Sequence, residues 1–307
     1  MALSQMGIIK KILAATLLLC GPAMAQEPYV LRFAEQLQQI DPTQVGTYPQ
    51  SQMGLYFVGQ WIGIDQAPEE KGFWFNKLPT KQQLKWGGVL RNRSRFAENN
   101  TALLAQFSYP LSLSSNTSIL LGIQVETAFY RLDFSKLQSV DGVLADPLLG
   151  RQSYWQPNLG VGFRLLQDHW YLRLALPQLF NKHQQAFFSD IRLADKPLYF
   201  AELGKHFTRL NQQHYLVRLQ WHNVNWNSPS LQLQLDYHWR RVIGTLALNH
   251  RKMVGLGFTF IEKRTFSFRY GYQWQFASQN NLGLKQHVLA LLIRFESLTT
   301  NSLTHVP

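Results

Sequence analysis

Histidine and cysteine are the side chains of this 307-residue chain that could hold a transition metal. No two histidines have the four-residue spacing that places a pair of zinc ligands on one face of a helix, and the single cysteine, Cys20, has no second cysteine to join it. The nine histidines are His169, His183, His206, His214, His222, His238, His250, His287 and His305. Their spacing predicts no metal site.

Acyl-transfer chemistry would need a nucleophile, a base and an orienting residue in register. The chain has neither a Gly-x-Ser-x-Gly nucleophile motif nor a Gly-rich phosphate loop, and Gly255 and Gly257 lie inside a strand pattern, where glycine permits a bend. Ser267 beside a histidine-bearing strand leaves a hydrolase open as an alternative. His222 and His238 fall on the polar faces of neighbouring predicted strands, where they could meet. We predict from these residues no enzyme activity and no cofactor.

The amino terminus has the pattern of a secretory signal peptide over residues 1–25. Lys10 and Lys11 precede an apolar stretch at residues 12–20, and residues 23–25 read Ala-Met-Ala, the small-x-small pattern that signal peptidase cuts. The mature chain is therefore predicted to begin at Gln26 and to be exported. No later run of about 20 apolar residues could cross a bilayer as a helix.

Three segments of the mature chain alternate between apolar and polar residues, which puts the two kinds on opposite faces of a β-strand. They are residues 217–222, 231–240 and 265–276. In the last of these the alternate positions are all aromatic: Phe266, Phe268, Tyr270, Tyr272, Trp274 and Phe276. The opposite faces of the three segments carry Arg218, Gln220, Gln232, Gln234, Asp236, Arg269, Gln273 and Gln275. One face of each predicted strand is thus apolar and the other polar.

Alternation alone fits a soluble β-sandwich as well as a membrane barrel. Trp and Tyr residues gather towards the predicted strand ends, where amphipathic rings would form girdles at the lipid–water boundary. These residues are Trp61, Trp170, Tyr237, Trp239, Tyr272 and Trp274. The formal net charge of +12 falls to +10 when Lys10 and Lys11 leave with the signal peptide, and a basic exported chain meets anionic lipid or acidic partners more often than nucleic acid. The pattern favours an all-β, antiparallel transmembrane barrel of the outer-membrane type.

Fourteen strands are predicted, an even number as single-chain bacterial outer-membrane barrels require. They span residues 52–63, 70–78, 83–93, 101–112, 117–133, 154–166, 169–178, 198–208, 213–223, 230–239, 242–249, 253–262, 265–276 and 284–295. The even-numbered connections are tight, and the two longest, at residues 134–153 and 178–197, fall on the opposite, extracellular end. We expect a periplasmic N-terminal segment at residues 26–50, the barrel at 51–296 and a short C-terminal tail at 297–307.

Several motifs resemble the PorP/SprF family of outer-membrane proteins associated with type IX secretion and gliding motility. Residues 60–68, Gln-Trp-Ile-Gly-Ile-Asp-Gln-Ala-Pro, are similar to the family's first strand and its loop, and residues 40–46 are similar to its Asn-Pro-Ala-Tyr-Ala-Gly stretch. Segments at 132–147, 157–162 and 174–177 are similar to its middle region in order and spacing. The matching positions are Asp41, Pro42, Gly46, Gln60, Trp61, Gly63, Asp65, Ala67 and Pro68.

The resemblance implies a noncatalytic barrel that works with secretion machinery. It implies that the protein receives exported proteins with a C-terminal sorting domain, holds them at the surface and contacts a periplasmic peptidoglycan-associated component. The chain departs from the family pattern where Asp41 replaces asparagine and Gln66 replaces glycine. Because of these departures, membership of the family is more secure than the binding partners that the resemblance implies.

The residues themselves support a narrower interpretation of the two motifs. Gln60 and Trp61 could clamp the loop, with the indole at the membrane interface, the amide on loop backbone and Pro68 limiting the freedom of the loop. Asp41-Pro42 would form a periplasmic turn. A general porin remains the alternative function. The amide-rich polar faces favour a filled or gated lumen over a charged ion filter.

Overall fold

The computed structural model describes residues 34–47, 51–64, 66–77, 84–133, 151–180, 198–209, 213–223, 229–250, 252–262, 265–275 and 285–295. The predicted signal peptide and C-terminal tail lie outside these ranges. The strands are β1 (Ser51–Gln60), β2 (Glu69–Lys77), β3 (Lys85–Arg95), β4 (Glu98–Ser112), β5 (Thr117–Asp133), β6 (Arg151–Gln167), β7 (Trp170–Leu176), β8 (Tyr199–Arg209), β9 (Gln213–Asn223), β10 (Ser230–Trp239), β11 (Val242–Asn249), β12 (Met253–Glu262), β13 (Phe266–Gln275) and β14 (Lys285–Phe295). The predicted fourteen strands are confirmed.

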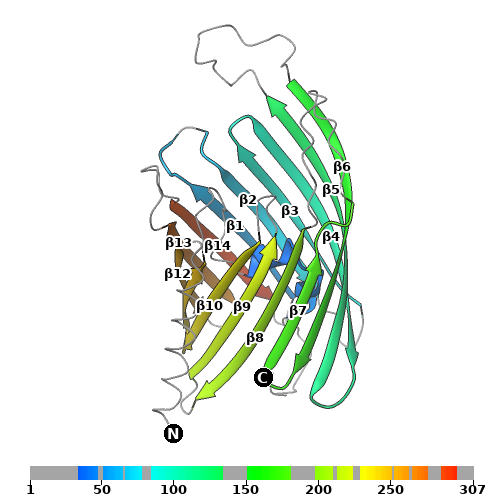
Figure 1. Cartoon of the computed structure of the whole chain (residues 1–307), viewed down its shortest axis with the longest axis vertical. Helices are drawn as coiled ribbons and strands as arrows, with labels where there is room; N and C mark the ends of the chain where they lie inside the picture. Colours follow the sequence, from blue (N-terminus) through cyan, green and yellow to red (C-terminus); the bar gives the residue numbers. More distant parts are fainter. Residues whose placement is uncertain are drawn as a thin grey trace.

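Every strand pairs antiparallel with its sequence neighbours, and β14 pairs with β1 to close the ring (Figure 1). The closing seam runs from Ser51 opposite Phe295 to Gln60 opposite Gln286. Two-residue turns join β6 to β7 and β10 to β11, with Asp168 (φ 46°) in the left-handed region that such turns use. We call the end with Ser51 and Phe295 the terminal end and the opposite end the loop end.

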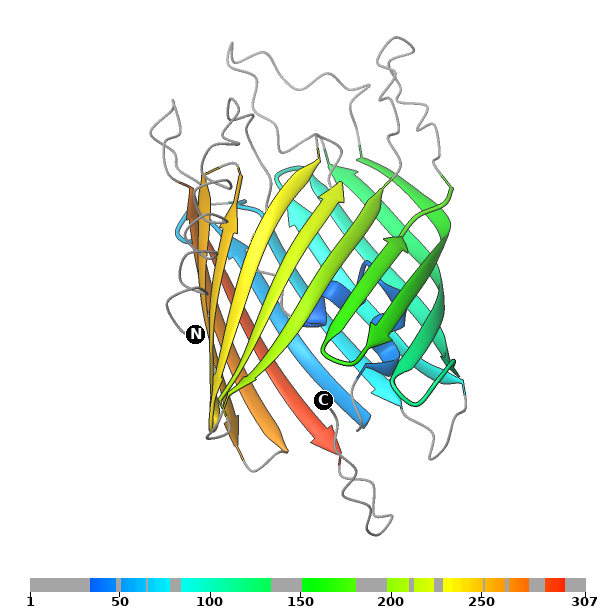
Figure 2. The same ribbon diagram turned by 60° about the horizontal axis from the view of Figure 1, so that its bottom comes forward.

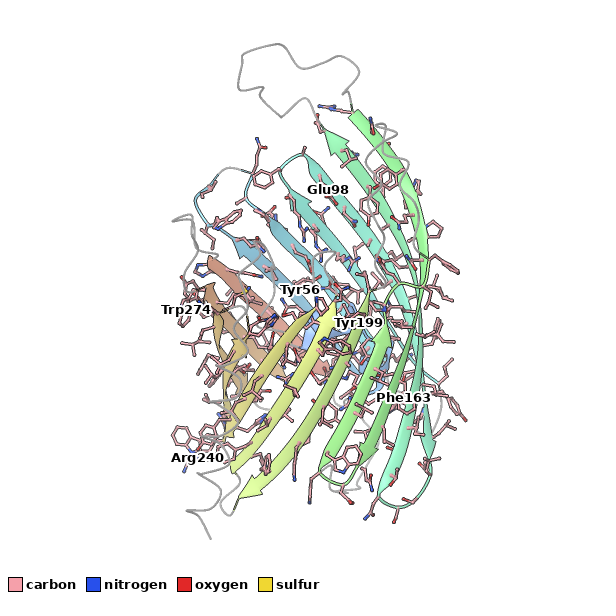
Figure 3. All side chains as sticks on the ribbon, in the orientation of Figure 1. Tyr56, Glu98, Phe163, Tyr199, Arg240 and Trp274 are labelled. Carbon is pink, nitrogen blue, oxygen red and sulfur yellow. The ribbon has the colours of Figure 1, made fainter. Side chains whose placement is uncertain are left out.

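The wall has the reverse of the usual burial pattern, because its apolar side chains are exposed and its polar side chains are buried. Along β13, Ser267 and Arg269 are buried, while Phe268 and Tyr270 are exposed by 40% and 37%. Figure 3 shows Trp274 on the outside of the wall and Tyr56 within it. An exposed apolar band around a polar interior suits a bilayer. The predicted membrane barrel is confirmed, and the sandwich alternative is not what the chain forms.

The strands differ in length, so the rim of the barrel is uneven. Figure 2 shows β5 and β6 rising beyond the short β7. β6 pairs with β5 along its whole length but with β7 only from Val161, opposite Leu176, to Gln167. Pro157 lies beyond the end of β7, just as Pro110 lies beyond the last β3 pair at Ser108. Both prolines therefore sit where a missing N–H breaks no ladder.

A short N-terminal segment lies inside the barrel, drawn in blue in Figures 1 and 2. It consists of helix α2 (Ala34–Gln38) and the 3₁₀-helix η1 (Pro42–Gly46). Leu37 and Ile40 pack against Ala175 of β7 and Phe200 of β8. We call residues 34–47 the plug. This position differs from the periplasmic segment expected at residues 26–50, because the buried side chains of the plug pack and bond against the inner face of the wall.

No helix among the described residues is long and apolar enough to cross a membrane. The plug helices are five residues each and hold their place through contacts with strands. Isolated helices this short are unstable in water. The wall therefore determines the conformation of the plug.

Candidate functional site: the plug and its seat

Two glycines opposite each other on β5 and β6 form the seat on which η1 rests. Gly122 pairs with Gly162 across the two strands. A Cβ atom on Gly122 would lie 2.8 Å from the backbone nitrogen of Thr43, and one on Gly162 would lie 2.7 Å from Oδ1 of Asp41. Only glycine leaves room for the plug backbone at these two positions. This is the close backbone approach that glycine inside a strand permits.

Asp41 both begins η1 and ties it to the wall. Its Oδ1 accepts a hydrogen bond of 2.9 Å from the backbone N–H of Thr43, which is the N-cap arrangement, and Pro42 follows at the first helical position. Its Oδ2 lies 3.0 Å from Nε of Arg173 on β7. Asp41 is completely buried and the Arg173 side chain is 3% exposed. Burial raises the pKa of the Asp41 carboxyl above its ordinary value, while Arg173 and Thr43 act in the opposite direction.

Arg173 is shared between the plug and the wall. Its Nη1 lies 3.5 Å from Oε1 of Glu202 on β8, which also accepts a 2.8 Å bond from the Tyr171 hydroxyl. The amide of Gln220 donates to the other oxygen of Glu202 at 2.6 Å. Arg173 therefore balances two buried carboxylates. Removing one partner of a buried ion pair is far more destabilising than replacing the whole pair by apolar residues.

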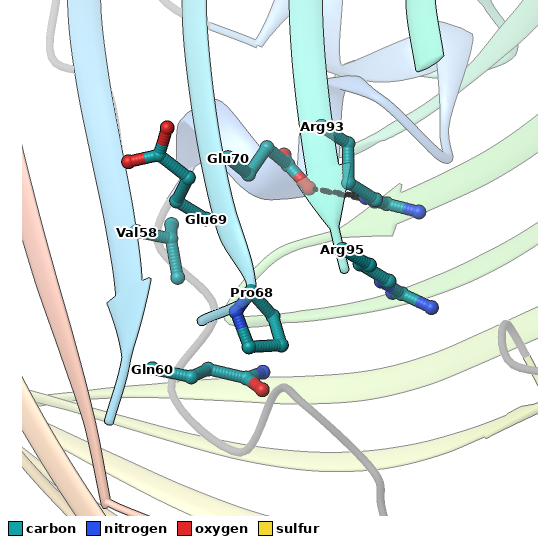
Figure 4. A pocket seen from close by; sticks show the side chains of 7 residues that line it. All are labelled: Val58, Gln60, Pro68, Glu69, Glu70, Arg93 and Arg95. Carbon is teal, nitrogen blue, oxygen red and sulfur yellow. Dashed lines mark hydrogen bonds and ion pairs between the residues drawn. The ribbon is translucent and has the colours of Figure 1, made fainter. Parts of the chain in front are cut away.

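A second group of polar contacts holds the end of α2 against β1, β2 and β3. The amide of Gln39 donates to the Tyr56 hydroxyl at 2.7 Å and to Glu70 at 2.8 Å, and its oxygen accepts from Arg91 at 3.2 Å. Glu70 is also bound by Arg93, at 2.6 Å (Figure 4). The Gln39 amide thus donates to Glu70 and accepts from Arg91, two wall residues of opposite charge.

The neighbouring Gln38 makes bonds through its side chain and its backbone. Its amide donates to Oδ1 of Asn76 on β2 at 2.7 Å, and its carbonyl accepts from Gln106 of β4. At the other end of the plug, Arg164 of β6 donates to the hydroxyl of Thr47 at 2.6 Å. The plug is therefore bound to the wall from β1 to β7.

The structure places the predicted residues Asp41, Pro42 and Gly46 together, but inside the lumen and not in a periplasmic turn. Pro42 packs on the glycine seat, and Gly46 closes η1. Nothing in the local sequence indicates this location, because the partners lie more than 70 residues along the chain. The Asp-Pro pair did carry an unused signal for a helix start.

The other predicted residues form the β1–β2 connection at the loop end. The backbone N–H of Gln60 donates to the carbonyl of Pro68 at 2.9 Å, and Gly63 has a φ of 98° that favours glycine. Trp61 (φ 47°) packs against Ala247 and Met253.

Ala247 of β11 and Met253 of β12, which Trp61 contacts, are inner-face positions. The predicted position of the Trp61 indole at the membrane interface is therefore wrong, because the left-handed backbone turns the side chain into the barrel. The loop closure comes from the Gln60 backbone. Asp65 lies outside the described residues, and Ala67 immediately precedes Pro68 in the connection.

The plug and the β1–β2 connection at the loop end are linked through one carboxylate. Glu70 accepts from Gln39 of the plug and also lines a small pocket at the loop end (Figure 4). That pocket is lined by Val58, Gln60, Pro68, Glu69, Glu70, Arg93 and Arg95. No sequence pattern marks Gln38, Gln39 or Arg173, since each is one polar residue among many.

The residues weighed for catalysis are not assembled into a site. His222 pairs with Ser230 and His238 pairs with His214, so the two histidines lie at opposite ends of the β9–β10 hairpin. The expected meeting of the two is wrong. Ser267 is opposite Ile261 and Leu292, not a histidine. Among the described residues, no group of three or more histidine, cysteine, aspartate and glutamate side chains could hold a metal ion.

A closed, 14-stranded antiparallel ring with an apolar outer band and a polar lumen defines an outer-membrane β-barrel. The family model described as "Type IX secretion system membrane protein PorP/SprF" matches residues 24–291. The chain belongs to the PorP/SprF family and is a type IX outer-membrane protein. In bacterial barrels of this type the short turns face the periplasm, so the terminal end is periplasmic and the loop end extracellular.

Solved structures with a similar fold are also outer-membrane barrels. A deltaS2S3 mutant of the monoaromatic hydrocarbon channel TodX is 10% identical with a TM-score of 0.50, over 89% of this chain and 96% of that one. A Pseudomonas aeruginosa FadL homologue is 10% identical with a TM-score of 0.49, over 83% and 92%. The KdgM porin is 10% identical with a TM-score of 0.40, over 80% and 99%. No curated protein matches.

Proposed function

We propose that this protein is a non-enzymatic anchor of the type IX secretion system, which holds exported proteins with a C-terminal sorting domain at the cell surface. Outer-membrane barrels of this family are typically non-enzymatic. The observation that carries the proposal is the occupied lumen, in which the Asp41–Arg173 ion pair fixes the plug. A barrel filled in this way serves better as a binding platform than as a diffusion pore.

The general porin is the competing function, and the plug is what disfavours it. Eight consecutive strands, β1 to β8, contribute bonds or packing contacts to residues 34–47. A solute would have to pass beside or displace a segment that is tied down by buried charges. We therefore expect the native protein to conduct ions poorly.

The proposed partners are the sorting domain of an exported protein on the extracellular side and a peptidoglycan-associated component on the periplasmic side. Outer-membrane lipid surrounds the exposed apolar band. The family supports the two protein partners, and the uneven extracellular rim formed by β5 and β6 offers a contact surface for the first.

Affinity purification from detergent-solubilised outer membrane, combined with planar-bilayer recording, tests the proposal. We expect a large surface protein to co-purify with the barrel, and the purified barrel to give little single-channel conductance. A deletion of the gene should release the surface protein into the medium. Robust conductance with no co-purifying surface protein would instead identify a porin.

A further inference from the structure

The chain that leaves β7 bonds to the inner face of β5 and β6 just above the plug. We call residues 177–180 the connection segment. Every second residue of β5 faces the lumen, and Gly122, Gln124 and Glu126 are successive inner-face positions as β5 runs towards the extracellular end. Gly122 supports the plug, whereas Gln124 and Glu126 bond to the connection segment. The connection segment therefore lies directly on the extracellular side of the plug.

A first relay of buried amides joins the backbone of the plug to the backbone of the connection segment. Gln106 of β4 and Gln124 of β5 are register partners and both are completely buried. The Gln106 amide donates to the carbonyl of Gln38 and, at 3.0 Å, to the oxygen of Gln124. The Gln124 amide in turn donates to the carbonyl of Pro177 at 2.8 Å. Hydrogen bonds in such a chain polarise one another, so the loss of one bond weakens the next.

A second relay runs parallel to the first and contains a buried ion pair. The oxygen of Gln39 accepts from Arg91 at 3.2 Å, and Arg91 pairs with one oxygen of Glu126 at 2.5 Å. The other oxygen of Glu126 accepts a longer bond, of 3.4 Å, from the amide of Gln178. The Arg91 and Glu126 side chains are only 11% and 3% exposed, so water and salt screen their attraction little. A shift of Gln178 therefore acts on the group that holds Gln39.

The connection segment has its own anchor on β6. The side chain of Asn158 donates to the carbonyl of Phe180 at 2.9 Å and accepts from the N–H of Phe180 at 3.1 Å. The N–H of Leu179 donates to the carbonyl of Leu159 at 2.7 Å. Among the described residues, these recorded bonds reach no residue of the plug. The anchor can therefore be altered without removing a bond of the plug.

We infer that the plug and the connection segment form one cooperative unit, so that a displacement of the connection segment from the extracellular side is transmitted to the plug. The two relays begin on consecutive residues, Pro177 and Gln178, and end on consecutive residues, Gln38 and Gln39. A partner that draws the connection segment away from β5 therefore weakens the docking of the plug, and a partner that holds it in place strengthens that docking. The coupling is a property of the barrel alone and goes beyond the proposed function, since it needs no exported protein.

Hydrogen exchange of the purified, full-length barrel tests the transmission. Asn158→Leu removes both side-chain bonds to Phe180, and we expect it to accelerate exchange of the plug backbone by about threefold to tenfold. Asn92→Leu on the outer side of β3 is the matched control, since Asn92 also makes two bonds, to Asn99 and Thr101, but neither lies on a relay. Exchange of the plug in Asn92→Leu should equal that of the native barrel.

The reverse experiment uses the fact that a coupling free energy acts equally in both directions. Gln39→Leu alters the plug alone, and we expect it to accelerate exchange of the Leu179 N–H, whereas Asn92→Leu should leave that N–H unchanged. Native exchange of the plug in Asn158→Leu, or of Leu179 in Gln39→Leu, would overturn the inference, provided that heat-modifiable migration shows a folded barrel.

A pair of charge variants at one position gives the same test without removing a buried anchor. Gln178→Glu sets a second carboxylate beside Glu126 and should accelerate exchange of the plug, because the two like charges repel. Gln178→Lys sets an opposite charge there, and exchange of the plug should be no faster than in the native barrel. Equal exchange of the plug in these two variants would also overturn the inference.

Discussion

The two halves of the lumen wall are both lined with buried polar side chains, but they satisfy these side chains in different ways. In the half formed by β1 to β7, polar groups bond to the plug, as Arg173 does with Asp41 and Asn76 with Gln38. In the half formed by β9 to β14, they bond to one another across strands. Asp236, for example, accepts from Arg218 and from Thr245.

This difference shows that one half is built around an internal ligand, whereas the recorded side-chain bonds of the other half stay within the wall. Loss of a polar side chain from the first half should loosen the plug, whereas the same loss in the second should weaken only the barrel. Hydrogen exchange of residues 34–47 and single-channel conductance report on the plug. Thermal unfolding in detergent reports on the barrel.

Arg173→Met should have the largest effect. The substitution leaves Asp41 and Glu202 buried without their cation, at a cost of about 3–5 kcal/mol. We expect rapid exchange of the plug backbone and a rise in conductance. Arg218→Met breaks an ion pair of similar burial in the other half and is the matched control, expected to lower the unfolding temperature while the plug stays protected. Equal hydrogen-exchange rates of residues 34–47 in the two variants would contradict the difference between the two halves of the wall.

Gly162→Leu should have the next largest effect, because the new side chain has to occupy the space of Asp41 and Pro42. Overpacking of this kind costs about 1–3 kcal/mol, which is borne by the docked plug. Conductance should again rise. Gly244→Leu on β11 is the control, since no atom lies within 4 Å of the added Cβ position, and its channels should remain closed.

Gln106→Leu removes the side-chain donor to the Gln38 carbonyl and should weaken plug docking by about 0.5–1.5 kcal/mol. Hydrogen exchange around residue 38 should accelerate severalfold without a measurable conductance. The counterpart in the other half is Gln234→Leu, which loses a 3.2 Å bond to Asp236. Acceleration at residue 38 in that variant would mean that the two halves are coupled.

Trp61→Ala should have the smallest effect on the plug and should lower the stability of the barrel by about 1 kcal/mol, since the ring is only half-buried against Ala247 and Met253. Plug exchange and heat-modifiable migration should not change. Surface display of cargo should fall, because the indole organises the extracellular β1–β2 connection. Loss of heat-modifiable migration together with loss of surface display would show that Trp61 is only a structural residue.

The strands could be predicted because each carries its own signal. The predicted bounds of residues 230–239 and 242–249 match β10 and β11, since two-residue alternation needs no knowledge of the partner strand. β1 was predicted to continue to residue 63, but it ends at Gln60, where the left-handed backbone of Trp61 breaks the ladder. That conformation depends on inner-face contacts that alternation does not encode.

The plug could not be predicted, because its position depends on contacts between distant parts of the chain. Asp41 and Pro42 mark a helix start, but the Gly122–Gly162 seat and Arg173 that fix its place come much later in the sequence. Gly160 and Gly162 stand in the 157–162 segment, but glycine inside a strand does not identify what approaches it. The sequence-derived expectation of a filled lumen came from the amides, and they line both halves.

The plug immediately precedes β1, and β1 is also the strand on which β14 closes the ring. The seat of the plug on β5 and β6 and the seam between β1 and β14 are therefore linked by the few residues between Thr47 and Ser51. A chain with an altered Asp41 or glycine seat would close its ring next to a plug that has not docked. Sequence changes in a few buried N-terminal residues would then appear as slow maturation of a barrel whose fourteen strands are unaltered.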